Sequence, residues 1–182
     1  MNFVVVIPAR YHSTRLMGKP LIKFNGTPMI VKTYKQCIKA VDQKLVYVAT
    51  DDQRVKKVCE KNNINVLMTS KNCLTGTDRV FETTKHLKAK TFINVQGDEP
   101  LFNPKDLKKL IKESKKFPND VITGYCEITD KRQFFDINVP KVVVSKDGHI
   151  IYASRAPIPF NKKKNLLKRG DKFVPMRFQK KN

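Results

Sequence analysis

Apolar, largely β-branched runs alternate along the first part of the chain with segments whose apolar positions recur at helical spacing. The apolar runs predict strands buried on both faces of a sheet; they are Phe3–Ile7, Leu45–Ala49, Ile64–Met68 and Thr91–Val95. The segments between them predict helices. Their inward-facing residues are expected to be Met29, Ile30, Tyr34, Ile38 and Val41, then Val55, Val58 and Cys59, then Val80, Phe81, Thr84 and Leu87. This alternation predicts an α/β fold with a mostly parallel sheet and helices on both faces.

Helix caps and turn residues set the expected boundaries of these elements. Pro8 is expected to end the first strand, because proline has no N–H for a ladder. Thr27-Pro28 predicts the start of the first helix, and Thr50, Asp51 or Asp52 can cap the second. Thr75 or Thr77 can cap a third helix that reaches about Leu87.

The later part of the chain predicts a different pattern. A helix from Asn103-Pro104 to Phe117 and a fifth strand over Asp120–Ile128 come first. Lys141–Ser145 and His149–Ala153 then flank Asp147-Gly148, which predicts a β-hairpin. From residue 161 the chain is rich in lysine with few apolar anchors. We therefore expect an α/β domain over 1–160 and a basic tail over 161–182 that is loose or ordered only by a partner.

The composition is strongly basic, with 37 lysines and arginines against 16 acidic residues and a net charge of +21. Such a charge favours anionic partners: nucleotides, nucleic acid or an acidic membrane surface. The lysines are spread along the chain, and no aromatic stacking platform or nucleic-acid motif accompanies them, so no specific nucleic-acid partner is expected.

The cysteines and the apolar runs indicate in which cellular compartment the protein is expected. The four cysteines are far apart and form no Cys-x-x-Cys pair, which favours free thiols in a reducing cytoplasm. Pro8 and Arg10 interrupt the first apolar run, so no signal peptide is expected. No apolar run approaches ~20 residues, so no membrane insertion is expected either.

A polar loop with three cations follows the first strand. Arg10, Arg15 and Lys19 occur there with the hydroxyls of Ser13 and Thr14. A buried strand that opens into a cationic loop is how an α/β protein holds phosphates at the carboxyl end of its sheet. The alternative is a solvated basic loop, which a lysine-rich chain also produces.

Two further segments carry candidate chemistry. Arg79 falls in the first turn of the third predicted helix, where a cation opposes the helix dipole; it is there for an anion or a base edge, or it is a surface arginine. Gln96-Gly-Asp-Glu-Pro100 follows the fourth strand directly, and Gly97 within it predicts a close backbone approach. A carboxylate at Asp98 suits Mg²⁺, which prefers one or two carboxylates plus substrate phosphates. The alternative is that Asp98 only caps its turn.

Several common motifs are absent from the sequence. It has no Gly-x-x-x-x-Gly-Lys-Ser/Thr loop and no Gly-x-Gly-x-x-Gly after the first strand, which excludes a P-loop NTPase and the dinucleotide fingerprint. The three histidines have neither metal-ligand spacing nor an obvious serine or cysteine partner.

Five motifs in order resemble one enzyme family. They are Ile7-Pro-Ala-Arg-Tyr-His-Ser-Thr-Arg-Leu-Met-Gly-Lys-Pro-Leu21, Ala49-Thr-Asp51, Thr75-Gly-Thr-Asp-Arg79, Asn94-Val-Gln-Gly-Asp-Glu-Pro100 and Ser154-Arg-Ala-Pro-Ile-Pro159. Together they resemble the 3-deoxy-manno-octulosonate cytidylyltransferases, the CMP-Kdo synthetases. The resemblance implies the Rossmann-like nucleotide-diphospho-sugar transferase fold and transfer of CMP from CTP to the sugar acid Kdo for lipopolysaccharide biosynthesis. It also implies a cytoplasmic homodimer that uses Mg²⁺.

The resemblance also implies roles for individual residues. Arg10, Lys19 and Asp98 would be catalytic, with Arg10 and Lys19 on the triphosphate and Asp98 on Mg²⁺. Gln96 would contact nucleotide or sugar, and Arg155 would pair with the sugar carboxylate. The residues implied to line the nucleotide site are Ala9, Arg10, Ser13, Arg15, Lys19, Thr75, Gly76, Arg79 and Gln96.

Departures from the family pattern leave alternatives open. Met17 stands where the family usually has proline, and after Pro159 the family's later sugar contacts and a second metal aspartate are not recognisable. The chain is accordingly expected to be a truncated or shortened relative. The alternatives to an active enzyme are a non-catalytic CTP-binding or assembly subunit, a truncated inactive form and a basic nucleic-acid-binding protein.

Overall fold

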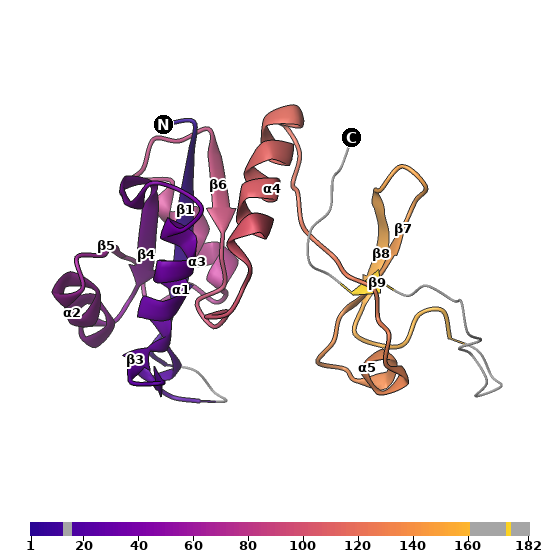
Figure 1. The fold of residues 1–182 in the computed structure, drawn as a ribbon, viewed down its shortest axis with the longest axis horizontal. Helices are drawn as coiled ribbons and strands as arrows, with labels where there is room; N and C mark the ends of the chain where they lie inside the picture. The colour runs from indigo at the N-terminus through magenta and orange to yellow at the C-terminus, as the bar shows by residue number, and fades with distance from the viewer. Residues whose placement is uncertain (13–15, 161–173, 176–182) are drawn as a thin grey trace. The chain divides into compact units, whose positions relative to one another are not determined.

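The computed structural model describes residues 1–12, 16–160 and 174–175 of the chain. The chain divides into two compact units, Met1–Lys109 and Leu110–Asn182. The elements are labelled in Figure 1.

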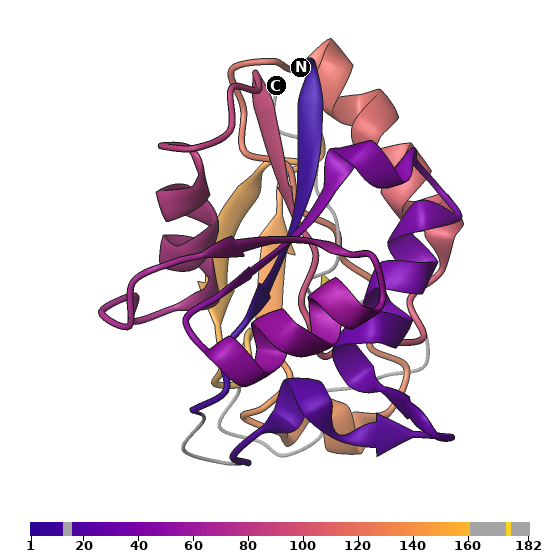
Figure 2. The same ribbon diagram turned by 90° about the vertical axis from the view of Figure 1, so that its left-hand side faces the viewer.

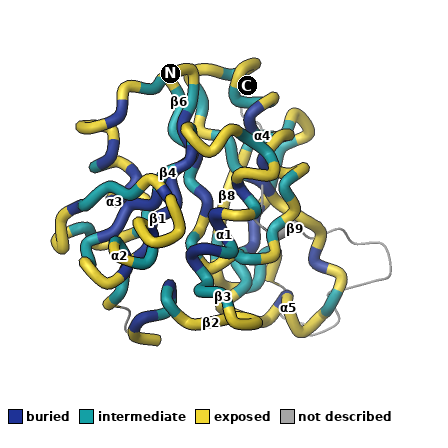
Figure 3. The backbone as a smooth tube through the Cα atoms, turned by 60° about the vertical axis from the view of Figure 1, so that its left-hand side comes forward, coloured by how far each residue is buried: buried dark blue, intermediate teal, exposed yellow. Residues whose placement is uncertain are grey.

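The first unit is built on a four-stranded parallel sheet in the order β5-β4-β1-β6. Its strands are β1 (Phe3–Ala9), β4 (Val46–Thr50), β5 (Asn65–Met68) and β6 (Thr91–Asn94). Figure 2 shows β1 and β6 side by side, with Val5 in register with Ile93. Val4 to Ile7 have no exposed surface, and β1 is correspondingly dark blue in Figure 3. The predicted parallel sheet, with a first strand buried on both faces, is confirmed.

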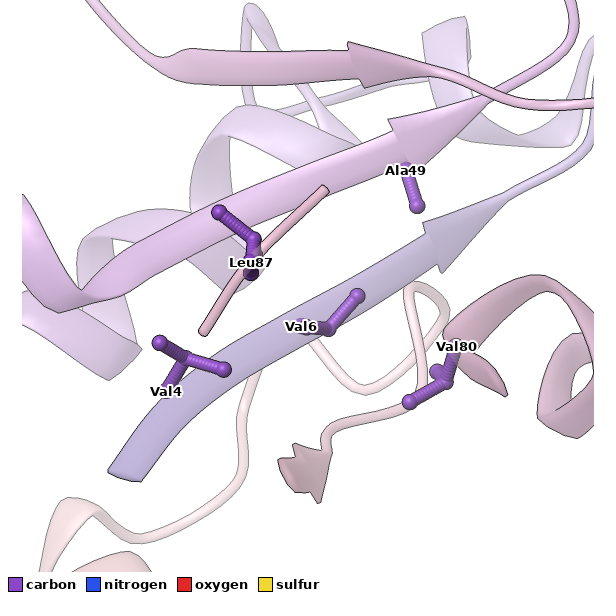
Figure 4. Packing of buried hydrophobic residues seen from close by; sticks show 5 residues of the cluster. All are labelled: Val4, Val6, Ala49, Val80 and Leu87. Atoms are coloured by element: carbon purple, nitrogen blue, oxygen red, sulfur yellow. The ribbon is translucent and has the colours of Figure 1, made fainter. Parts of the chain in front are cut away.

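Helices cover both faces of this sheet. α3 (Gly76–Thr83) supplies Val80 to a cluster with Val4, Val6, Ala49 and Leu87 (Figure 4). Side chains alternate along a strand, so Ile7 points to the other face. There, Ile7 and Ile30 of α1 (Met29–Ile38) both lie near Gly97. α2 (Gln53–Lys61) packs on β4 and β5.

The helix starts follow local capping chemistry. Asp52 caps α2 by accepting a hydrogen bond from the Arg54 amide at 2.8 Å. Thr75 and Asp78 form a reciprocal capping box at the start of α3, with hydrogen bonds of 2.7 and 3.1 Å. Both predicted caps are confirmed.

The start of the first helix differs slightly from the prediction. Thr27 and Pro28 form β3, which pairs with β2 (Lys23–Phe24), and α1 begins one residue later at Met29. The remaining short elements of this unit are the 3₁₀ turns η1 (Lys19–Leu21) and η2 (Gln43–Leu45).

The prediction that Pro8 ends the first strand is wrong. β1 continues to Ala9, with Pro8 in register with Ala49 of β4. The Pro8 carbonyl faces Gly97, on the side of β6. The N–H and C=O of one strand residue point to the same side, so the nitrogen of Pro8 also faces the side of β6. The pairing of β1 with β6 ends at Val6, so no β6 residue lies opposite Pro8 to need an N–H donor there.

The predicted inner face of the third helix is partly wrong. Val80 and Leu87 are buried as expected, but Phe81 is 69% exposed and Thr84 is also exposed. Arg79 and Thr83, both without exposed surface, face inward instead. The helix also ends at Thr83, earlier than predicted, and a turn leads on to Leu87.

The second unit begins within α4 (Pro104–Lys116) and contains α5 (Lys131–Phe135) and a three-stranded antiparallel sheet in the order β8-β7-β9. The predicted hairpin is confirmed as β7 (Lys141–Val144) and β8 (Ile150–Ser154). β9 (Val174–Pro175) pairs with β7 and lies within the predicted tail. The other tail residues, 161–173 and 176–182, lie outside the described residues.

The predicted fifth strand over Asp120–Ile128 is wrong. Only isolated bridges form there, at Thr123, Gly124 and Ile128. Val121 is 87% exposed, so the apolar residues of this segment do not bury one common face. α5 was not predicted; Asp130 caps it by accepting from the Arg132 amide at 2.8 Å, and Phe134 is fully buried.

Candidate functional site

A cleft of about 520 Å³ opens in the first unit where β1 and β6 end. Six of the predicted site residues line it: Ala9, Arg10, Lys19, Gly76, Gln96 and Asp98. The sequence did not single out three further lining residues, Leu16, Pro20 and Met29. Their apolar side chains carried no chemical signal, and only the fold brings them to this edge of the sheet.

The loop after β1 is closed by a tight contact between its two ends. The Gly18 amide donates to the Tyr11 carbonyl at 2.8 Å, and Gly18 adopts φ 69°. A Cβ at Gly18 would lie 3.2 Å from the Tyr11 ring, so glycine suits both the backbone and the space. On its other side the Tyr11 ring lies 3.4 Å from the Arg54 guanidinium of α2. Ser13 and Arg15 lie outside the described residues.

Lys19 follows this closure and pairs with Asp98 across the cleft. The two side chains are 37% and 46% exposed, so the pair faces solvent in the cleft rather than the core. The pair joins the loop after β1 to the turn after β6. A cation and a carboxylate are thereby held together at the carboxyl end of the sheet, where α/β proteins bind their ligands.

The turn after β6 approaches β1 closely at Gly97. A Cβ there would lie 2.7 Å from the Pro8 carbonyl oxygen, a backbone atom. Thr33 of α1 donates its hydroxyl to the Gly97 carbonyl at 3.1 Å. The predicted close backbone approach at Gly97 is confirmed, and it fixes where Gln96 and Asp98 project. The Gln96 amide is exposed and lies 3.5 Å from the Asn94 side chain.

The start of α3 forms another wall of the cleft. A Cβ on Gly76 would lie 3.3 Å from Pro8 Cγ and 3.8 Å from Gln96 Oε1. Arg10 donates to the Leu74 carbonyl at 2.7 Å, so the loop after β1 is tied to the segment before this helix.

Arg79 is fully buried, so the surface-arginine alternative is wrong. Its guanidinium hydrogen-bonds to Thr69 Oγ1, contacts the Ser70 carbonyl at 3.3 Å and lies 3.1 Å from the Asp51 carboxylate. Arg79 does not line the cleft described above. The periodicity of the sequence did not predict the burial of Arg79, because the compensating carboxylate of Asp51 comes from the end of β4.

The donor set for a divalent cation is a single carboxylate. Among the described residues, no three His, Cys, Asp or Glu side chains form a group able to hold a metal ion. Asp98 lines the cleft, is about half exposed and has Lys19 beside it. One carboxylate suits Mg²⁺ when substrate phosphates supply other ligands, so the residues fit a cation that arrives with a nucleotide.

Arg155 lies in the second unit. Its guanidinium donates to the Ile137 carbonyl at 3.0 Å and lies 3.5 Å from the Asn138 carbonyl. The nearby Lys141, 1% exposed, donates to the carbonyls of Asp136 and Arg155 at 2.5 and 3.0 Å. Burial lowers the pKa of Lys141, while the Asp136 carboxylate opposes that shift. Nothing in the sequence pattern indicates that this lysine is buried.

An open parallel sheet with a cationic loop, a close glycine turn and a carboxylate at its carboxyl edge defines a nucleotide-binding α/β protein. The chain matches the cytidylyltransferase family over residues 4–181, and it belongs to that family. Among the described residues, no helix is both long and apolar enough to cross a membrane.

Named relatives and a solved structure agree with this membership. The chain is 43% identical to the 3-deoxy-manno-octulosonate cytidylyltransferase of Marinobacter nauticus, over 88% of this chain and 62% of that protein. It is 39% identical to the 8-amino-3,8-dideoxy-manno-octulosonate cytidylyltransferase of Shewanella halifaxensis, over 89% and 68%. A solved CMP:2-keto-3-deoxy-manno-octonic acid synthetase complexed with CTP matches 97% of this chain and 71% of its own, with a TM-score of 0.86 and 33% identity. The chain thus spans less than two thirds of the Marinobacter protein.

Proposed function

We propose that this protein transfers CMP from CTP to 3-deoxy-manno-octulosonate or a close analogue, for lipopolysaccharide biosynthesis. The anomeric hydroxyl of the sugar acid attacks the α-phosphorus, the bond to the β-phosphate oxygen breaks, and pyrophosphate leaves. The observation that carries the proposal is the cleft with Arg10, Lys19 and Asp98, in a chain that resembles a synthetase solved with CTP.

The cationic wall of the cleft would bind the triphosphate. Arg10 and Lys19 both line it, and we assign Ser13 and Arg15 of the same loop to the phosphates as well. Attack at the α-phosphorus builds negative charge on the phosphoryl oxygens and on the departing pyrophosphate. Cations already fixed in place stabilise that charge without reorganising during the reaction. Lys19 would leave Asp98 for a phosphate oxygen when the nucleotide binds.

Another part of the cleft lining would receive the cytidine. Ala9, Gly76 and Gln96 line the cleft there, and Thr75 fixes the first turn of α3 through its capping box. A side chain at position 76 would approach Pro8 and Gln96. A glycine there leaves room for a nucleoside to lie against the backbone.

Asp98 would hold Mg²⁺ together with phosphate oxygens of the nucleotide. The chemistry that such an ion supplies is neutralisation of charge on the phosphoryl oxygens. The contact between Lys19 and Asp98 would thus break when the magnesium–nucleotide complex binds. Lys19 would then contact a phosphate oxygen, and Asp98 would contact the Mg²⁺ ion.

The acceptor is a sugar acid, and a guanidinium matches its carboxylate in charge and planar geometry. Arg155 is the residue that we assign to this contact, with Gln96 on the sugar hydroxyls. Two relatives of similar identity carry the names of the 8-hydroxy and the 8-amino sugar, so position 8 is where the acceptor identity has to be measured.

We further infer a cytoplasmic homodimer. All four cysteines are free thiols, and burial raises the pKa of Cys37 and of Cys59 to about 12, which keeps both protonated. Free thiols are the usual state in a reducing cytoplasm. The exposed apolar side chains of strand β8 offer a surface for the second copy.

The test is pyrophosphate release from CTP with each sugar acid in the presence of Mg²⁺. Asp98→Asn should lower the turnover at least ~100-fold, the loss typical of removing one group that stabilises the transition-state charge. Glu99→Gln is the matched control, because Glu99 is exposed, adjacent and outside the cleft lining. CTP binding by calorimetry without any pyrophosphate release would instead establish a non-catalytic CTP-binding subunit. Absence of both would contradict the proposal.

A further inference from the structure

The buried ion pair of Arg79 and Asp51 is costly for the fold. Arg79 has no exposed surface, and the Asp51 side chain is 9% exposed. Among the described residues, the guanidinium nitrogens Nε and Nη2 and the Asp51 Oδ1 oxygen have no hydrogen-bond partner, although Nη2 lies 3.1 Å from Asp51 Oδ2. Buried charges with incomplete hydrogen bonding contribute little to stability, and apolar replacements of similar size often serve as well. Core stability alone therefore gives no reason for this pair.

The pair lies beneath the segment that leads from β5 to α3, residues 69–76. Arg79 holds the first part of this segment through Thr69 Oγ1 and the Ser70 carbonyl. The Glu82 carboxylate, one turn further along α3, accepts from the Ser70 amide at 3.0 Å and from the Cys73 thiol at 2.9 Å. Polar contacts from α3 thus fasten the segment from its inner side.

The other side of the segment faces the cleft. The Leu74 carbonyl accepts from Arg10, and Gly76 is part of the cleft lining. The Leu74 side chain is 83% exposed, so apolar packing of Leu74 does not fix this stretch. Its conformation therefore depends on polar contacts, which come from Arg79, Glu82 and Arg10, from the capping box of Thr75 and from the Thr69 amide, which donates to the Thr50 carbonyl at 2.8 Å.

We propose that Arg79 is a positioning residue that fixes the segment 69–76 through Thr69 and Ser70, and that it does so without contacting the nucleotide. This inference rests on the proposed function and changes one of the roles that the family resemblance implies. Because the guanidinium is fully buried and bonded to Thr69 and Ser70, its effect on the nucleotide would pass along the backbone from these residues to Gly76. Because that backbone is fixed, Gly76 and the Leu74 carbonyl that accepts from Arg10 are in place before CTP binds.

Thr69 offers a mild test, because its hydroxyl can be removed without leaving a cavity. Thr69→Val removes the acceptor of the Arg79 hydrogen bond, while Thr69→Ser retains it as the matched control. Neither change touches a residue of the cleft lining. In nucleotide-free protein, Thr69→Val should speed amide hydrogen exchange at residues 71–76 about tenfold, as expected for loss of one charge-assisted hydrogen bond. Exchange in β1 and β4 should stay unchanged.

The kinetic readout separates positioning from mere stability. Thr69→Val should raise KM for CTP several-fold and reduce the ratio of kcat/KM for CTP to that for UTP, with a smaller effect on kcat. Thr69→Ser, which keeps the hydroxyl, should have the wild-type values. A role in stability alone would lower the melting temperature and leave the KM and the base preference of the folded protein unchanged.

A double variant removes the pair entirely. Arg79→Leu with Asp51→Leu leaves no unpaired buried charge, so it should fold, with the same faster exchange at residues 71–76. Wild-type exchange at residues 71–76 in both Thr69→Val and the double variant would overturn the proposal. If the wild-type protein neither binds nor turns over CTP, the proposed function fails by itself, whereas the exchange data still decide whether Arg79 fixes this segment.

Discussion

At the scale of single residues, the Asp52 carboxyl has a pKa well below its ordinary value because of its partner Arg54. Its carboxylate accepts from Arg54 Nη2 at 2.7 Å, from Nε at 2.9 Å and from the Arg54 amide at 2.8 Å. The side-chain hydrogen bond from Arg54 is the largest cause, and it lowers the pKa of Asp52 from 3.8 to about 2. The same guanidinium lies over Tyr11, so this pair also braces the loop that carries Arg10 and Lys19.

This shift predicts an acid-dependent contribution to stability. A carboxyl whose pKa is lower in the folded state stabilises the fold fully above its ordinary pKa and loses that contribution as the pH falls toward the folded value. Asp52→Asn should therefore lower the free energy of unfolding near neutral pH, by about 1 kcal/mol or less because Arg54 is half exposed. The gap to wild type should close as the pH falls from about 4 to about 2. Urea unfolding across this range measures it, and a gap independent of pH would contradict the ion pair.

At the scale of elements, the contact between the end of β1 and the turn after β6 determines where Asp98 lies. Gly97→Ala would place a methyl group 2.7 Å from the Pro8 carbonyl oxygen, a backbone atom of β1, so the turn after β6 would have to shift. We expect a loss of about 1–3 kcal/mol in the free energy of unfolding, as for other overpacked sites. Pyrophosphate release by the folded fraction should fall further, because the turn must shift away from Lys19.

A milder glycine substitution provides the comparison for Gly97→Ala. Gly76→Ala meets Pro8 Cγ at 3.3 Å, a side-chain atom, so its effect on stability should be smaller. Thermal unfolding and single-turnover assays on both variants decide the point. Equal stability losses would show that the close approach of Gly97 to Pro8 does not constrain the turn.

The elements also show what could be predicted from the sequence. The buried run of β1, the caps Asp52 and Thr75 and the close approach of Gly97 depend on local chemistry or on strict periodicity, and they were predicted correctly. Arg79 was missed because apolar periodicity assumes that apolar residues are buried, whereas its partner Asp51 comes from another element. The prediction that Pro8 ends β1 was wrong for a related reason. Whether a proline is tolerated in β1 depends on where the neighbouring strand β6 ends, and β6 belongs to a distant part of the sequence.

At the scale of the whole molecule, the proposed nucleotide residues that the structure describes all belong to the first unit, and Arg155 belongs to the second. The sequence motifs propose both sets as candidates, because each motif is short and continuous. The Asp120–Ile128 segment lies in the second unit, where the apolar residues are more exposed and periodicity gave a strand that does not form. The hairpin of the same unit was predicted correctly, because its Asp147-Gly148 turn is a local signal that needs no buried face.

The exposed strand β8 predicts how two copies associate. β8 is an edge strand of its sheet, and Ile151 and Tyr152 are 66% and 57% exposed. An exposed apolar edge favours association, and a second copy of the same strand satisfies it symmetrically. Ile151→Lys should therefore convert the dimer to a monomer in sedimentation velocity experiments. Lys146→Glu, in the turn of the same hairpin, should leave it dimeric. CTP affinity should be unchanged in both variants, because the cleft lining lies in the other unit. A monomeric wild-type protein at micromolar concentration, or a dimer that survives Ile151→Lys, would contradict this interface.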